Sequence, residues 1–300
     1  QINNAASVNP INLVATGLLA TPHLAMDAQL LANQLDDYKR LLQSLPYTDL
    51  VEIPEGDGKE WIAYAEKMGM VSVGKHSLGD IIQADDSQAI SLSYYRNNVF
   101  HIFAMPSLLA SLFVNNRGHE LEEIQTLCKF LYPFFKAELF LRWELEELPE
   151  VIDIWLEALV GLGLLERQGN NFSRPAANSN EYVKLAGFAH VAMQTQERYF
   201  LTLSLLTKVG SGHINAKELE EQSSILASRI SVLHGISTPE FFDKNLFRTL
   251  IEQLTAQGLL VNNEEGQLTF DDSLTAMTQE LERVLDASLR QSILQITWQQ

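Results

Sequence analysis

The stretches LEALVGLGLLERQGNNFSR (156–174) and LIEQLTAQGLLVNNEEGQLTF (250–270) follow the same plan. Each is a helix-like run that ends in Gly-Leu-Leu, followed by a polar turn and a short strand-like tail. Glycine tolerates the left-handed backbone that often ends a helix, where a residue with a Cβ atom is disfavoured. We therefore predict that Gly163 and Gly258 have positive φ directly after a helix.

The pattern occurs a third time nearer the start of the chain. Gly163 and Gly258 lie 95 residues apart, and Gly69 lies 94 residues before Gly163. Two further helix-like segments precede each copy, and Asp27 and Asn215 stand where helix N-caps are preferred. Three helices followed by a two-stranded ribbon is the order of a winged helix, although helix, glycine and strand in succession is also a common local motif.

The predicted fold class is mainly α with small β-ribbons: three tandem winged-helix-like modules plus a C-terminal helix. The first copy is longer than the others and continues into strand-like residues up to Tyr94. The C-terminal helix is predicted from apolar residues at helical spacing, namely Leu274, Met277, Leu281, Val284 and Leu285. The predicted bounds are 9–95, 96–180 and 181–272 for the modules and 273–300 for the C-terminal helix.

The charge and composition of the chain disfavour some classes of function and of structure. The 300 residues include 46% hydrophobic residues and have a formal charge of −17, which disfavours binding to nucleic acid. The lone Cys128 excludes an internal disulfide and is expected in the core. No signal peptide is visible. The chain opens without Met and enters apolar sequence at once, so we expect it to be a piece of a longer protein.

The longest uncharged apolar run is Val99–Val114. It is too short for a comfortable membrane span. Three interpretations stay open: a buried helix of the second module, an exposed patch that docks on another domain, or a membrane contact. Corresponding segments of the other two modules are also apolar nearly all round, which favours a buried helix with Phe103 and Leu109 in the core.

Two motifs are candidates for contacts between domains. YYRNN (94–98) places an arginine between paired tyrosines and asparagines, and FKAELFLRW (135–143) has two basic residues in an aromatic setting. Arginine stacks on rings and holds carboxylates in a bidentate fork. An arginine that only ties a strand end to a helix within one module is the alternative. The candidate interdomain contacts are Tyr95, Arg96, Asn97, Lys136, Arg142 and Trp143.

YYRNN, YPFFKAELFLRWELEELPEVID (132–153), RISVLHGISTPEFFDKNLF (229–247) and the opening INNAASVNPINLVATGLLAT (2–21) closely resemble the C-terminal region of the large bacterial glycerol-3-phosphate 1-O-acyltransferase family. The resemblance implies a parent protein that transfers an acyl group from acyl-CoA or acyl carrier protein to sn-glycerol 3-phosphate, the first step of phospholipid synthesis. It also implies a peripheral enzyme on the cytoplasmic face of the bacterial inner membrane.

The family's catalytic signature is His-x4-Asp, in which the histidine is the general base. None of the seven histidines has Asp five residues later, and His213 with Glu218 is the nearest approach. We therefore expect no catalytic, substrate-binding or metal-binding residue and no cofactor in this chain. The chain is expected to be inactive alone and to stabilise or regulate an upstream acyltransferase domain of the same polypeptide. The alternative is a membrane-docking or partner-protein-binding module.

Overall fold

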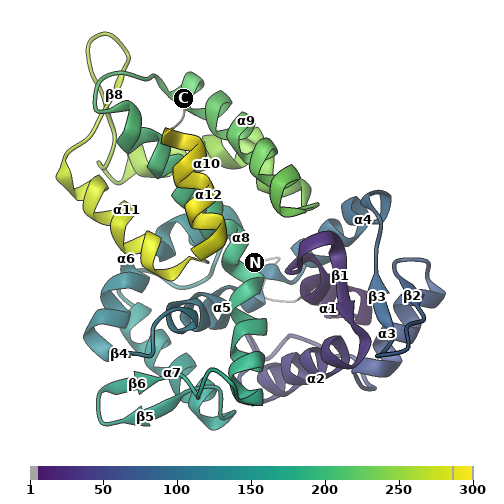
Figure 1. Cartoon of the computed structure of the whole chain (residues 1–300). Coiled ribbons are helices and arrows are strands. Elements are labelled where there is room, and N and C mark those ends of the chain that lie inside the picture. The colour runs from purple at the N-terminus through teal and green to yellow at the C-terminus, as the bar shows by residue number, and fades with distance from the viewer. Residues whose placement is uncertain (1–5, 286, 299–300) are drawn as a thin grey trace.

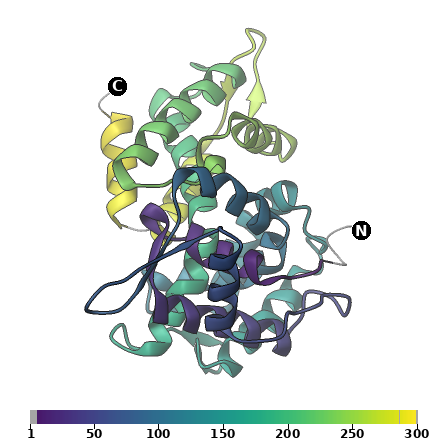
Figure 2. The same cartoon turned by 90° about the vertical axis from the view of Figure 1, so that its right-hand side faces the viewer.

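A computed structural model describes residues 6–285 and 287–298 of the protein. This part of the chain is mainly helical, with twelve α-helices and three small antiparallel sheets (Figure 1). The elements recur in the same order along the chain. We describe them as three units, and in Figure 2 the later part of the third unit (green) lies above the other two.

The first unit has three helices and a three-stranded sheet, in which β3 pairs with both β1 and β2. The β2–β3 ribbon projects from the body of the molecule (Figure 2). In chain order the elements are α1 (Pro10–Leu19), η2 (Pro22–Leu24), β1 (Ala25–Asp27), α2 (Ala28–Ser44), α3 (Gly58–Lys67), β2 (Ser72–Gly74) and β3 (Ile81–Gln83).

The second unit repeats this topology, because β6 pairs with both β4 and β5. Its elements are α5 (Phe100–Val114), β4 (Gly118–Glu120), α6 (Leu121–Leu139), α7 (Leu148–Gly161), β5 (Glu166–Gln168) and β6 (Asn171–Ser173).

The third unit has a two-stranded sheet. The segment that corresponds to the third strand still bonds to it: Gly212 N donates to Leu268 O at 2.9 Å, and Leu268 N donates to Ile214 O at 2.8 Å. The elements are α8 (Asn180–Val209), α9 (Ala216–His234), η3 (Pro239–Phe242), α10 (Lys244–Ala256), β7 (Val261–Asn262) and β8 (Leu268–Thr269).

The three glycines end their helices in the same way, and the positive φ predicted for Gly163 and Gly258 is confirmed. Gly69, Gly163 and Gly258 have φ of 70°, 73° and 73°. The N–H of Gly163 donates to Val160 O and that of Leu164 to Leu159 O, both at 2.9 Å, which is the Schellman pattern. The other two helices end with the same pair of bonds. A Cβ atom at any of the three would meet no atom within 4 Å, so only the backbone conformation requires glycine.

Helices α5 and α8 form the centre of the core and pack against each other. Every residue from Phe100 to Phe113 is buried, and Phe103 and Leu109 have 0% exposure. The predicted burial of the apolar run is therefore confirmed. Cys128 is also fully buried, as expected.

Two predicted elements differ from the structure. The strand-like tail of the first copy is helix α4 (Asp86–Asn97), which begins with a capping box between Asp85 and Gln88. The predicted single C-terminal helix is two helices, α11 (Asp272–Val284) and α12 (Ala287–Trp298). Leu285 after α11 has an extended backbone, and its carbonyl accepts a hydrogen bond from Asn115 Nδ2 at 2.5 Å. The five apolar residues that predicted the helix are buried.

Candidate functional site

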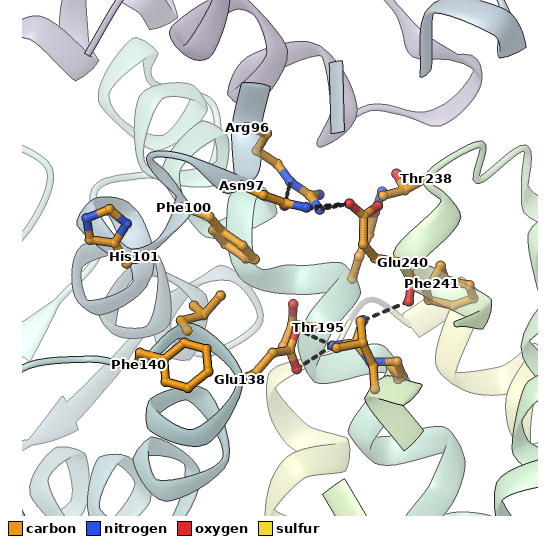
Figure 3. Close-up of a pocket in the computed structure, with 14 residues that line it drawn as sticks. Arg96, Asn97, Phe100, His101, Glu138, Phe140, Thr195, Thr238, Glu240 and Phe241 are labelled. Atoms are coloured by element: carbon orange, nitrogen blue, oxygen red, sulfur yellow. Dashed lines mark hydrogen bonds and ion pairs between the residues drawn. The ribbon is translucent and has the colours of Figure 1, made fainter. Parts of the chain in front are cut away.

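Charged side chains meet in the interior where α4, α6, α8 and η3 come together (Figure 3). They line a cavity of about 250 Å³. Arg96 is in the last turn of α4, Glu138 near the end of α6, Arg198 within α8 and Glu240 on η3. Arg96 and Arg198 are 6% and 2% exposed, so leaving either charge without a partner would destabilise the fold.

Arg198 and Glu138 form the tighter ion pair. Arg198 Nη2 lies 2.5 Å from both carboxylate oxygens of Glu138, and Tyr199 Oη donates to Glu138 Oε2 at 3.0 Å. Burial on its own would lower the pKa of Arg198, but the charge of Glu138 outweighs it and the pKa is raised. Burial raises the pKa of Tyr199 well above its ordinary value, so the phenol stays a hydrogen-bond donor.

Arg96 and Glu240 form the second pair, with Arg96 Nη2 3.4 Å from Glu240 Oε1. Asn97 Nδ2 donates to the same oxygen at 2.7 Å (Figure 3). Arg96 also lies over the ring of Phe100, 5.0 Å from its centroid. Burial would raise the pKa of Glu240, yet the positive charge of Arg96 lowers it below its ordinary value.

The two pairs are linked, because Arg198 Nη1 donates to the backbone oxygen of Glu240 at 3.2 Å. The four charged groups thus compensate one another and connect α4, α6, α8 and η3. A guanidinium held by a carboxylate is a poor proton donor and a poor base. The arrangement therefore positions helices rather than performing acid–base chemistry.

A second cluster joins the loop after α6 to the loop after α2. Arg142 Nη1 donates to Tyr47 O at 2.6 Å, and the Arg142 backbone N–H donates to Tyr47 Oη at 3.1 Å. The rings of Tyr47 and Trp143 meet edge to face with centroids 5.1 Å apart. Lys136 Nζ donates to Trp143 O at 2.8 Å and pairs with Glu144 at 2.5 Å.

The six predicted contact residues lie in or beside these two clusters, three at each. Arg96 and Asn97 belong to the first cluster, and the carbonyl of Tyr95 beside them accepts a hydrogen bond from Asn12 Nδ2 at 2.7 Å. The second cluster contains Lys136, Arg142 and Trp143. All of these contacts join parts of this chain to one another.

Sequence reasoning missed Glu138, Arg198 and Glu240. Arg198 did give a signal, because it lies within a helix whose residues are buried nearly all round. Ionisable residues in such a helix are almost always paired. The sequence did not identify the partner, which is 60 residues away.

Within residues 6–285 and 287–298, no three His, Cys, Asp or Glu side chains come together as metal ligands. In the same residues no single helix is long and apolar enough to cross a membrane. Taken together, helices α4 and α5 are long and apolar enough for a membrane span, but their axes are bent by 88° at the break between them.

Comparison with known proteins identifies the chain. The model of the glycerol-3-phosphate acyltransferase C-terminal region matches residues 1–263. Proteins named glycerol-3-phosphate acyltransferase are similar over 297 residues, 99% of this chain: that of Ectopseudomonas mendocina (strain ymp) is 43% identical and that of Pseudomonas aeruginosa (strain UCBPP-PA14) 42% identical. The chain spans about 36% of the length of these relatives. The resemblance seen in the sequence is confirmed, and the chain belongs to the glycerol-3-phosphate acyltransferase C-terminal region family.

Proposed function

We propose that this chain is the non-catalytic C-terminal portion of a glycerol-3-phosphate 1-O-acyltransferase. In this proposal the parent protein transfers an acyl group from acyl-CoA or acyl carrier protein to sn-glycerol 3-phosphate at the cytoplasmic face of the inner membrane. The chain itself stabilises or regulates the upstream acyltransferase domain by packing against it.

One observation carries the proposal. Relatives that are 42–43% identical over 99% of the chain are named for the acyltransferase reaction, yet the chain corresponds to only about 36% of their length. The sequence agrees with it, because none of the histidines has the aspartate five residues later that the family's His-x4-Asp signature requires. Both findings favour catalysis by another part of the polypeptide.

We propose further that the three units are winged-helix-like modules, with bounds near 9–95, 96–180 and 181–272, followed by the segment 273–300. The recurring element order and the three matching helix ends support this assignment. Charge argues against nucleic acid as a partner, because α7, the third helix of the second module, has no Lys or Arg and includes Glu150, Asp153 and Glu157. In this proposal the three modules form a structural support against which the upstream acyltransferase domain packs.

The rival proposal of membrane docking loses its best candidate feature. Within this run every residue from Val99 to Phe113 is buried, and the helix packs against α8, so the run would have to leave the core to reach a bilayer. Trp61, Trp143 and Trp155 are buried too. Their fluorescence is therefore expected to stay unchanged when anionic vesicles are added. A blue shift that saturates with lipid would favour direct docking instead.

The scaffold role is tested in the longer protein. Arg198→Met unpairs Glu138 inside the chain without altering the acyltransferase domain. We expect this variant to lower both the yield of folded parent protein and the midpoint of its thermal inactivation. If the chain loses stability while the inactivation midpoint of the parent is unchanged, the two parts do not support each other and the proposal fails.

A further inference from the structure

A groove of about 790 Å³ runs along α8, from Tyr182 to Glu197. Its floor is α8, which in Figure 1 passes through the middle of the molecule. One wall is made by the end of α1, η2, β1 and the start of α2. The other wall is made by the end of α9 and the start of α12. The volume lies within the range of roughly 300–1,000 Å³ that is typical of small-molecule sites.

Small residues line both the floor and one wall of the groove. Ala186 and Gly187 lie on its floor, and Ala20 and Ala25 lie on the facing wall. A Cβ atom on Gly187 would lie 3.1 Å from Gln34 Cδ. The glycine thus lets α2 approach closely enough for Gln34 Nε2 to donate to its carbonyl oxygen at 3.1 Å.

The two walls meet at η2, where the chain takes an unusual conformation. His23 and Leu24 both have positive φ, 56° and 49°, which is rare for residues with a Cβ atom. Two contacts hold them there: His23 N donates to Gly235 O at 2.8 Å, and Leu24 is 1% exposed in the core. The strained turn thus joins the first unit to the end of α9 and fixes the relation between the walls.

The lining of the groove is mainly apolar and adaptable. Met26 and Met193 present flexible thioether side chains from opposite elements. Leu30 and Val183 at the rim are 41% and 46% exposed, so apolar surface is left in contact with solvent. A ligand that removes this surface from water gains free energy in proportion to the area buried.

We propose that this groove binds a single unbranched hydrocarbon chain and leaves the polar head of the ligand outside. From Tyr182 to Glu197 the floor is roughly 22 Å long at about 1.5 Å per residue. An extended chain advances about 1.25 Å per carbon for C–C bonds of about 1.5 Å. The groove therefore accommodates about 16–18 carbons. Because Asp27 and Glu197 also line it, the lining offers no excess of positive charge for an anionic head.

The proposal does not rest on the proposed catalytic role, since binding is measured directly on this chain. The probe is palmitate, kept below the concentration at which it forms micelles and used to displace an environment-sensitive fluorescent fatty acid. We expect saturable binding of one palmitate per chain. Across saturated fatty acids of increasing length, we expect the Kd to fall roughly 4- to 15-fold for each two carbons up to the length of the groove, the lower value for half burial and the upper for full burial of the added carbons.

Ala186→Phe tests the location. The added ring occupies the floor and is expected to weaken palmitate binding at least about tenfold. Ala20→Leu on the facing wall is a second variant that does not alter α8. Ala63→Phe, on the exposed side of α3, is the matched control and is expected to leave the Kd unchanged. Melting curves confirm that each variant is folded.

Lysophosphatidylcholine with a chain of the same length separates recognition of the chain from recognition of the head. We expect it to compete with palmitate, because both place a hydrocarbon chain in the groove. The proposal is overturned if only one of the two ligands displaces the fluorescent fatty acid. It is also overturned if Ala63→Phe weakens palmitate binding as much as Ala186→Phe does, or if the Kd does not depend on the length of the fatty acid. Unchanged palmitate binding in Ala186→Phe, together with a destabilised longer protein, would assign the groove to a polypeptide segment and also overturn the proposal.

Discussion

Removal of the Arg198 side chain tests the buried ion pairs most sharply. Arg198→Met keeps much of the volume of the side chain but leaves Glu138 without its cation, and Arg198 is 2% exposed. Breaking a buried pair by removing one partner typically costs about 3–5 kcal/mol, because the remaining charge is desolvated and unpaired. We expect a loss of that size in the free energy of unfolding, or roughly 5–8 °C in Tm for a chain of this length.

The double variant Arg198→Met/Glu138→Gln removes both charges and keeps an acceptor for Tyr199 Oη. Replacing a whole buried pair by neutral groups is often close to neutral for stability. The double variant should therefore be more stable than Arg198→Met alone, with a coupling energy of about 2 kcal/mol or more in a double-mutant cycle. Urea unfolding followed by circular dichroism gives all four free energies.

A matched pair on the surface supplies the control. Arg248 holds Glu220 through two hydrogen bonds of 2.9 Å, but Arg248 is 54% exposed. Solvent screening makes such pairs weak, so Arg248→Met is expected to cost far less than Arg198→Met. Equal losses in the two variants, or additive effects of Arg198→Met and Glu138→Gln, would show that burial does not make the inner pair critical.

Three further predictions concern the helix ends, the core and pH. Gly163→Val and Gly258→Val each force a β-branched residue into the left-handed region and should cost about 1–3 kcal/mol; wild-type Tm in both would contradict the repeat. Leu109→Asp buries an unpaired charge and should leave a chain without a cooperative melting transition; a normal melt would contradict the core assignment. Arg96 lowers the folded-state pKa of Glu240 below its ordinary value of 4.5, so its stabilisation is present above that pH and is lost as the pH falls through the lowered pKa. The stability difference between wild type and Glu240→Gln should therefore shrink below about pH 4.5, and a difference that grows there would oppose the assignment.

Local signals in the sequence predicted local structure well. Glycine after a helix required positive φ at residues 69, 163 and 258, and the side chains of Asp27 and Asn215 accept from backbone N–H groups at the starts of α2 and α9. The uncharged run 99–114 was expected in the core because a helix that is apolar nearly all round needs enclosure. These features depend on neighbours in the chain, so the sequence alone is sufficient to find them.

Features that depend on distant partners escaped prediction. Arg96 was singled out, but its partner Glu240 lies on η3, 144 residues further along the chain. The end of α11 is another example, since Asn115 from the second unit bonds to the carbonyl of Leu285. One miss is local instead: the residues after Asp85 alternate like a strand, yet the capping box between Asp85 and Gln88 begins helix α4 there. In each case tertiary contacts or capping outweighed the local pattern.

The proposal that this chain is the non-catalytic part of an acyltransferase has one direct test. The purified chain is incubated with sn-glycerol 3-phosphate and acyl-CoA, and lysophosphatidic acid is quantified, with the longer protein as the positive control. We predict product from the longer protein and none above background from the chain alone. Turnover by the chain alone that disappears in His213→Ala would contradict the proposal and would identify His213 and Glu218 as a working dyad.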